Sequence, residues 1–228
     1  MMLSLAYKPR DKYDWLIFDI LREDYVECIL NKLLQHDPYT FWHCVSVARE
    51  SIRIADCIGE SLTVIHEIGV AAILHDIGKL NIPVEIIRKP GRLTPMEFDF
   101  IKQHPLIGAD MVHQSGCYSD KIIQGIRNHH INLDGTGYGG ILGTVPSLYE
   151  RIIRIADSFD AMTDNRPYHD AFECNKAILQ LKSEKGTAYD PFLVDAFSCV
   201  GPSYKIEKSS ETVFNTSAFY SIKEWQVI

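Results

Sequence analysis

Residues 61–80, SLTVIHEIGVAAILHDIGKL, contain the longest apolar run in the chain and close it with a histidine, an aspartate and a lysine. The run is apolar nearly all round at helical spacing, which predicts a helix buried inside a larger bundle. Burying the imidazole of His75 and the carboxylate of Asp76 without partners would be costly, and a divalent metal ion is a good partner for both. Lys79 follows His75 by four residues, so the two share a face if the helix continues.

Most of the remaining chain also carries apolar residues at intervals of three and four, which predicts an all-α fold. The clearest local signal lies in RLTPMEFDFIKQHP, where Thr94 can cap a helix, Pro95 can begin it and Glu97 completes a capping box. Pro105 is expected to end or kink this helix. Residues 131–146 are rich in glycine and form a loop by composition.

The chain divides into an N-terminal helical segment (1–38), a central domain (39–200) and a C-terminal tail (201–228). After Gly201 the residues are rich in β-branched and aromatic side chains, which favours a short β-hairpin or a docked tail. The expected architecture is therefore an all-α helical bundle with a short C-terminal appendage.

Composition excludes some classes of partner. The 228 residues carry a net charge of −7. This charge disfavours binding of a nucleic-acid polymer over an extended surface, but it does not disfavour binding of a small anion at a local site. No apolar run is long enough for a membrane span, and the N-terminus lacks the features of a signal peptide. The six cysteines are scattered without a CxxC pair, so we expect reduced thiols, mostly in the core. These features predict a cytoplasmic protein that binds neither a nucleic-acid polymer nor a membrane.

More histidines and aspartates lie in or at the ends of other apolar helices. Apart from His75 and Asp76, the set consists of His43, His104, His129, His130 and Asp157. Taken singly, each has a plain structural explanation, such as a hydrogen-bonded core histidine, a helix-end residue facing the helix dipole, or a surface salt bridge between Asp157 and Arg154. Taken together, they place nitrogen and oxygen ligands on successive helices of one bundle. Such ligands, without thiolates, suit iron, manganese, nickel or zinc at a hydrolytic site.

The neighbouring sequence decides which of these histidines and aspartates indicate a metal site. His-Asp dipeptides occur three times, so the dipeptide alone is weak. His36-Asp37 is followed by a proline in a polar break, which predicts a solvated turn. His129 and His130 point about 100° apart within a helix, so they can serve one site only at its edge or where the helix ends.

The chain resembles the HD-GYP phosphodiesterases, a branch of the HD metal-dependent phosphohydrolase superfamily. The resemblance covers roughly His43 to Val200 and includes LHDIGKLNIP, RKPGRLTPMEF, IKQHPLIGADM, NHH, DGTGYGG, RIIRIADSFDAMTDNRPY and GTAYDPFLVDAF, in the family's order. It implies that residues 39–200 form an HD-GYP catalytic domain, all-helical, with a centre of two or three metal ions.

The resemblance also implies the roles of individual residues. The expected metal ligands are His43, His75, Asp76, His104, His129, His130 and Asp157, with Asp76 bridging two ions. Lys79 is expected to contact the scissile phosphate and to act in catalysis together with Asp76. The other expected substrate contacts are Gly137, Tyr138, Arg166 and His169.

Three departures from the family's pattern modify these expectations. The proline that normally follows Gly-Tyr is replaced by Gly139, which predicts a more flexible loop. The glutamate that supports a third metal is replaced by Tyr39, so we expect two divalent ions, iron or manganese first, with nickel and zinc as alternatives. The basic residue three places after Arg166 is replaced by His169, which weakens phosphate contact at neutral pH.

The expected reaction is hydrolysis of cyclic di-GMP to linear pGpG, and in some members onward to GMP, by a hydroxide formed on a dinuclear metal centre. Two alternatives stay open at this stage. One is a phosphodiesterase for a mixed guanine–adenine cyclic dinucleotide. The other is a sensor or protein-interaction module with weak turnover. A homodimer or a regulatory protein partner is also left open.

Overall fold

The computed structural model of the chain describes residues 9–164 and 171–201. Across these two ranges the protein is built from helices, and only two isolated β-bridges occur, so the predicted all-α class is confirmed. The predicted C-terminal hairpin and the predicted substrate contacts Arg166 and His169 lie outside the described residues. The described elements are α2 (Lys12–Ile20), α3 (Asp24–His36), α4 (Pro38–Cys57), α5 (Leu62–Leu74), the 3-10 helix η1 (Ile77–Asn81), α6 (Val84–Ile87), α7 (Pro95–Ile101), α8 (His104–Ser115), α9 (Asp120–Asn128), α10 (Leu148–Thr163), α11 (Cys174–Ser183) and α12 (Pro191–Val200).

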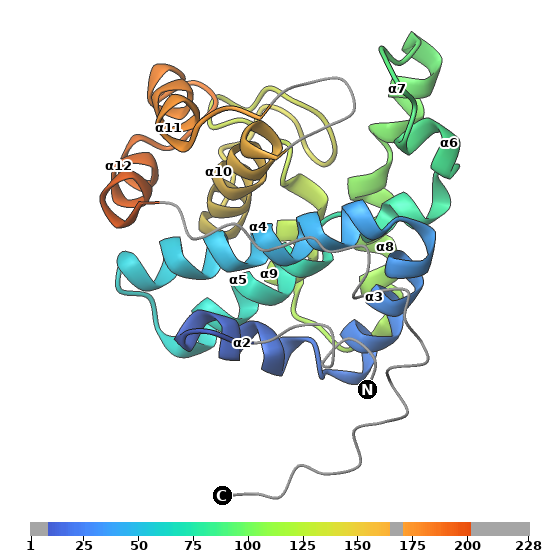
Figure 1. Ribbon diagram of the computed structural model, residues 1–228, viewed down its shortest axis with the longest axis horizontal. Helices are drawn as coiled ribbons and strands as arrows, with labels where there is room; N and C mark the ends of the chain where they lie inside the picture. Colours follow the sequence, from blue (N-terminus) through green and yellow to red (C-terminus); the bar gives the residue numbers. More distant parts are fainter. Residues whose placement is uncertain (1–8, 165–170, 202–228) are drawn as a thin grey trace, which may run out of the picture.

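Helices α4 and α5 pack against each other at the centre of the bundle (Figure 1). Helices α2 and α3 cover one side of this pair, and α10, α11 and α12 lie on the other. As its apolar sequence predicts, α5 is buried from Ile68 to Leu74, whereas Leu62 in its first turn is 82% exposed. The buried C-terminal half of α5 leads directly to His75 and Asp76, and α4, α9 and α10 pack against this helix.

Capping residues set several helix starts. Ser61 caps α5, and Thr94 and Glu97 form the predicted capping box at the start of α7. Asp37 is the N-cap of α4 and is fully buried, so the prediction of a solvated turn was wrong. Its carboxylate accepts hydrogen bonds from the amide of Thr40 at 3.0 Å and from the Arg88 guanidinium at 2.7 Å. A buried carboxylate is satisfied here by a cap and an ion pair together.

Two helix boundaries differ from the sequence prediction. The α-helix α5 ends at Leu74 and the chain tightens into η1, so His75 and Lys79 do not share an α-helical face. In a 3-10 helix residues three apart eclipse each other, and Lys79 accordingly reaches Asp76. Pro105 lies in the first turn of α8, which begins at His104, so this proline starts a helix and does not end one.

Glycines allow η1 and α8 to touch through their backbones. A Cβ at Gly78 would lie 2.0 Å from the carbonyl oxygen of His104 and 2.7 Å from the amide nitrogen of Gly108. Any larger residue would push the two elements apart. Because Asp76 is the N-cap of η1 and His104 begins α8, this close approach brings a predicted carboxylate ligand next to a predicted imidazole ligand.

The cysteines and the helix lengths test two further expectations. All six cysteines are free, as predicted, but Cys44 is the only buried one and four are exposed, so the placement mostly in the core was wrong. Among the described helices, none combines the length and the apolar character that a membrane crossing requires.

Candidate metal centre

The seven predicted metal ligands converge from five different elements. They come from the middle of α4, the end of α5, the start of α8, the end of α9 and the middle of α10. Their donor atoms fall into three overlapping groups, each with all of its atoms within 4.8 Å of one another. The groups are His43, His75 and Asp157; His75, Asp76 and His129; and His104, His129 and His130. The bundle thus gathers every one of these residues in one place.

Three of the imidazoles are oriented by the same local contact. In His75, His104 and His129 the Nδ1 atom lies 2.7 Å from the carbonyl oxygen of the residue three positions earlier. A carbonyl oxygen can only accept, so Nδ1 carries the proton and a neutral ring leaves a lone pair on Nε2. The accepting carbonyls belong to Ala72, Ile101 and Ile126. The three rings therefore present Nε2 as the ligand atom.

These Nε2 atoms face one another and lack protons to share. The Nε2 atoms of His104 and His129 lie only 3.2 Å apart. The Nε2 atom of His75 is buried and has no hydrogen-bond partner among the described residues. Two facing lone pairs and an orphaned buried acceptor are unfavourable without a cation. Divalent ions held by these groups of donors would satisfy the three atoms, so the residues fit a metal centre.

Burial keeps the rings of His75, His129 and His130 neutral. It lowers the pKa of His75 and holds the pKa of His129 well below its usual range, with the nearby His75 and His104 rings adding to the shift at His129. Burial, assisted by the adjacent His129 ring, also holds the pKa of His130 well below its usual range. Neutral imidazole is the form that binds a metal ion.

His43 is held by two aspartates from α10. Its Nδ1 atom lies 2.6 Å from Asp160 Oδ2, and its Nε2 atom lies 3.1 Å from Asp157 Oδ1. Burial by itself lowers the pKa of His43, but the hydrogen bonds to Asp157 and Asp160 outweigh it and raise the pKa to about 9. A carboxylate on one ring nitrogen commonly orients the other nitrogen toward a metal. Asp160 thus has an orienting role that the sequence analysis missed, although its position one turn after Asp157 was the available signal.

The two predicted carboxylate ligands are ionised despite their burial. Burial raises the pKa of Asp76, but Lys79, His75 and His104 hold it well below its usual range. Asp76 Oδ1 lies 3.0 Å from His104 Nε2, and Asp76 Oδ2 lies 2.5 Å from Lys79 Nζ. The two oxygens therefore face different neighbours, which suits a carboxylate shared between two ions.

Asp157 does not form a salt bridge with Arg154, which was the alternative structural explanation for this aspartate. Burial raises its pKa, but the hydrogen bond from His43 and the nearby His130 hold it well below its usual range. Among the described residues, Arg154 donates instead to Asn132 Oδ1 at 3.0 Å and to Ser158 Oγ at 3.2 Å. Arg154 thus reaches neutral partners, and the carboxylate of Asp157 stays directed at the histidines.

A cavity of about 390 Å³ opens onto this cluster. Lys79, Arg154, Tyr39 and Tyr138 line it together with five of the predicted ligands. The ring of Tyr138 stacks on the ring of His130, with centroids 4.3 Å apart and planes 29° apart. Burial raises the pKa of Tyr138, so its phenol is protonated and can donate a hydrogen bond into the cavity.

The glycine loop is packed closely against α9. A Cβ at Gly137 would lie 2.1 Å from the carbonyl oxygen of His130, and one at Gly140 would lie 1.7 Å from Asn128 Oδ1. Gly139 has a φ of +108°, whereas proline is fixed near −65°. The backbone around Gly139 therefore cannot accept the family's proline unchanged. The expected flexibility of the loop stays a prediction, and the structure adds that these glycines allow a close approach of the loop to α9.

A helical bundle that gathers histidines and aspartates from five elements around one cavity is the architecture of an HD-type metal site. The family description "HD domain" matches residues 42–193, and the chain belongs to this family. This assignment confirms the fold and the family that the seven motifs implied.

Curated relatives support the resemblance stated above. A cyclic di-GMP phosphodiesterase of Thermotoga maritima is 36% identical over 90% of this chain and 56% of its own length. A 3′3′-cGAMP-specific phosphodiesterase of Vibrio cholerae is 35% identical over 75% of this chain and 38% of its own length. The chain thus spans about half the length, or less, of these two relatives.

Among solved structures, Bd1817, an HDG"Y"P protein from Bdellovibrio bacteriovorus, has a TM-score of 0.63 and 16% identity. The alignment covers 87% of this chain and 77% of that protein. At this identity the likeness concerns the fold, which it supports over most of the described bundle.

Proposed function

We propose that the chain is a metal-dependent phosphodiesterase that hydrolyses a cyclic dinucleotide, first of all cyclic di-GMP, to the linear dinucleotide pGpG. The observation that carries the proposal is the set of three imidazoles whose Nε2 lone pairs converge beside two ionised aspartates and a lysine. Phosphate diesters are anionic, and this combination is suited to neutralising a phosphoryl group at a metal centre.

The seven converging residues would hold two divalent ions, iron or manganese first. His43, His75 and Asp157 form one group of donors, and His104, His129 and His130 form another, with Asp76 between them. Ions bound there supply Lewis-acid stabilisation of the phosphoryl oxygens and lower the pKa of water toward neutrality. Asp160 keeps His43 in the ligating orientation through the hydrogen bond at Nδ1.

Lys79 is the cation best placed to act on substrate. Its side chain is 21% exposed, lines the cavity and lies beside Asp76. In the reaction its ammonium group donates to a phosphoryl oxygen and offsets the charge that builds up there. Tyr138 covers the ring of His130 and keeps bulk water from that ligand.

The decisive experiment incubates metal-loaded protein with cyclic di-GMP, with the mixed guanine–adenine cyclic dinucleotide and with linear pGpG, and separates the products by chromatography. We expect pGpG from cyclic di-GMP. Because the two relatives differ by only one percentage point in identity, the mixed dinucleotide is the second candidate substrate. Tight binding of either compound without any product would instead identify a sensor.

Replacement of Lys79 by Met tests the catalytic role of the ammonium group. We expect turnover of cyclic di-GMP to fall at least about a hundredfold, in keeping with the loss of one preorganised donor. The metal content of the variant, measured by elemental analysis, should stay that of the wild type. Unchanged turnover would show that Lys79 only satisfies Asp76.

A further inference from the structure

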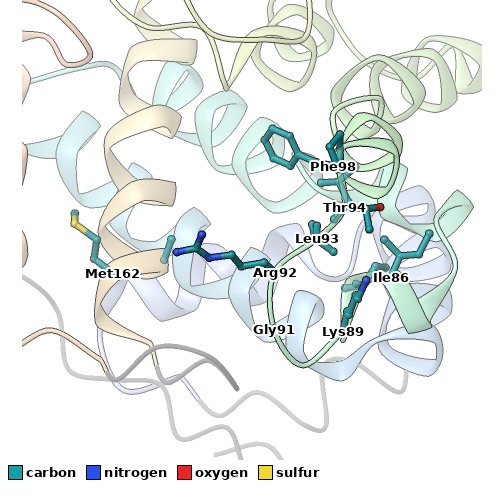
Figure 2. A pocket seen from close by; sticks show the side chains of 12 residues that line it. Ile86, Lys89, Gly91, Arg92, Leu93, Thr94, Phe98 and Met162 are labelled. Atoms are coloured by element: carbon teal, nitrogen blue, oxygen red, sulfur yellow. The ribbon is translucent and has the colours of Figure 1, made fainter.

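A second cavity, of about 910 Å³, is shown in Figure 2, and it shares lining residues with the metal cavity. We call it the apolar cavity. Its walls come from α6, the loop between α6 and α7, α7 itself and the end of α10. The apolar side chains from the three helices include Ile86, Ile87, Phe98, Ile101, Ala161 and Met162. The loop belongs to the RKPGRLTPMEF motif, none of whose residues is among the expected metal ligands or substrate contacts.

One cation of the apolar cavity is available to a ligand. Lys89 is held by the carboxylate of Glu97, with Nζ–O distances of 2.7 and 2.8 Å. Arg92 is exposed, and in the described part of the chain it makes no ion pair or hydrogen bond. Figure 2 shows its side chain extending from the loop toward Met162 of α10. The cavity therefore offers an apolar surface with one uncommitted guanidinium group.

The two cavities adjoin along shared side chains. Both are lined by Ile87, Leu93, Phe98, Ile101 and Ala161. Phe98 is 46% exposed, and its ring lies 6.3 Å from the ring of Tyr138, which stacks on His130. A continuous series of rings thus leads from the apolar cavity to the predicted metal ligands.

The volumes of the two cavities suggest that they bind different parts of a cyclic dinucleotide. Pockets for small molecules span about 300–1,000 Å³, and the metal cavity, at about 390 Å³, lies near the lower limit. A cyclic dinucleotide carries two purines and two ribose phosphates, so the metal cavity accommodates only the part around the reacting phosphate. A neighbouring space with apolar walls is suited to a planar purine.

We infer that the apolar cavity binds one purine of the cyclic dinucleotide, that Phe98 stacks on this base, and that Arg92 selects guanine. The inference rests on the proposed function, because it assumes that the phosphate is bound at the metal site. Arginine matches the O6 and N7 acceptors of guanine with two parallel donors, whereas adenine presents an amino donor in place of O6. The uncommitted guanidinium therefore favours guanine over adenine in this cavity.

The stacking role is tested by Phe98→Ala, with Phe100→Ala as the matched control. Both phenylalanines lie on α7 and are about equally exposed, at 46% and 48%, but only Phe98 lines the cavity. Calorimetric titration of metal-loaded protein in a Lys79→Met background, in which turnover is expected to be at least about a hundredfold lower, gives the dissociation constant for cyclic di-GMP with little hydrolysis. We expect it to rise about tenfold for Phe98→Ala, as for other lost base–aromatic contacts, and less than twofold for Phe100→Ala. Equal effects of the two changes would overturn the stacking role.

The guanine preference is tested by Arg92→Ala, with Arg22→Ala as a control for net charge, since Arg22 is exposed and does not line the cavity. We expect Arg92→Ala to weaken binding of cyclic di-GMP about tenfold and binding of cyclic di-AMP less than twofold. An equal loss for both ligands would assign Arg92 to phosphate and overturn the guanine selection.

A substrate without purines separates this inference from the proposed function. Metal-loaded wild type should hydrolyse bis(p-nitrophenyl) phosphate, because this diester carries no purine and its turnover reports on the metal cavity alone. If the wild type turns over no diester while the binding contrasts hold, the proposed reaction fails and the purine site stands. If the wild type binds no cyclic dinucleotide in either metal state, the purine site is overturned.

Discussion

At the scale of single residues, helix ends explain why three separated histidines share one orientation. The last four carbonyls of an α-helix lack intrahelical partners. Ala72, Ile101 and Ile126 lie in the last turns of α5, α7 and α9, and each accepts a hydrogen bond from the histidine that follows three positions later. This bond gives a carbonyl at the helix end a side-chain donor and fixes the tautomer of the histidine ring. A histidine just past a helix end is thereby turned into an oriented ligand without help from another element.

Asp160 gives the first prediction at this scale. Replacing it by Ala removes the carboxylate that orients His43, and such outer partners typically contribute 10- to 100-fold to metal affinity. We expect that loss in a metal-binding titration of Asp160→Ala. Asp195→Ala is the control, because Asp195 pairs with Lys185 on the surface and touches none of the expected ligands. Equal metal affinities of the two variants would remove Asp160 from the site.

The second prediction at the scale of single residues concerns Gly139. Replacing Gly139 by the family's proline would change the backbone φ angle from +108° to about −65°. It would also place a Cβ 2.7 Å from the carbonyl oxygen of Arg127 if the backbone did not move. We expect Gly139→Pro to destabilise the fold by more than about 1 kcal/mol, seen as a melting temperature lower by about 2–4 °C or more. A variant at least as stable as the wild type, with full activity, would show that the loop adapts freely.

At the scale of elements, the site depends on how helices begin and end and less on their middles. His75 and Asp76 follow the last residue of α5, His104 begins α8, and His129 follows the last residue of α9. A helix end lets adjacent residues turn toward one side, which is how His129 and His130 reach the same group of donor atoms as His104. The caps that fix these boundaries therefore act on the site as well as on stability.

The cap of α4 yields a prediction about stability and pH. Burial raises the pKa of Asp37, but hydrogen bonds from Thr40 and Arg88 outweigh it and lower the pKa below 3.8. A carboxylate whose folded pKa is depressed stabilises the fold above its unfolded pKa and loses this contribution as the pH falls through the folded pKa. Asp37→Ala should therefore cost about 1–2 kcal/mol of unfolding free energy at pH 7, and less at pH 3.

Urea denaturation of wild type and Asp37→Ala at both pH values checks this. Asp110→Ala is the matched control, because the carboxylate of Asp110 pairs with Arg127 on the surface and should contribute under about 1 kcal/mol. A cost for Asp37→Ala that is as large at pH 3 as at pH 7 would show that the carboxylate charge is not responsible.

At the scale of the whole molecule, the predicted ligands tie distant parts of the chain together. They extend from α4 to α10; α4, α9 and α10 pack against α5, and α8 packs against α9 and η1. Without a cation, facing lone pairs such as those of His104 and His129 oppose this packing. Metal binding is therefore expected to stabilise the bundle as a whole, because the sites exist only in the folded state.

This gives a prediction for thermal unfolding. Manganese at about a hundred times its dissociation constant should add about 2.7 kcal/mol, which raises the melting temperature of a chain of this size by about 5–10 °C. His129→Ala should abolish the increase, and His113→Ala, an exposed histidine on α8, should retain it. A melting temperature that manganese leaves unchanged in the wild type would argue against the metal centre.

The sequence by itself determined the helices, several of their caps and the kinds of ligand available. Helical spacing, Ser61, Thr94 and the buried run that ends at His75 are local features, and local physics decides them. The seven expected ligands could also be named in advance, because the motifs that carry them follow the order of the HD-GYP family.

Only the tertiary structure decided which of these groups meet. The alternative partners of Asp157, the reach of Lys79 from a 3-10 helix and the orienting role of Asp160 depend on contacts between elements far apart in the chain. The close approach at Gly78 and the cavity beside Phe98 depend on the same packing. Sequence spacing fixes directions within one helix, whereas the distance between two helices is set by every side chain packed between them, and no single motif contains that information.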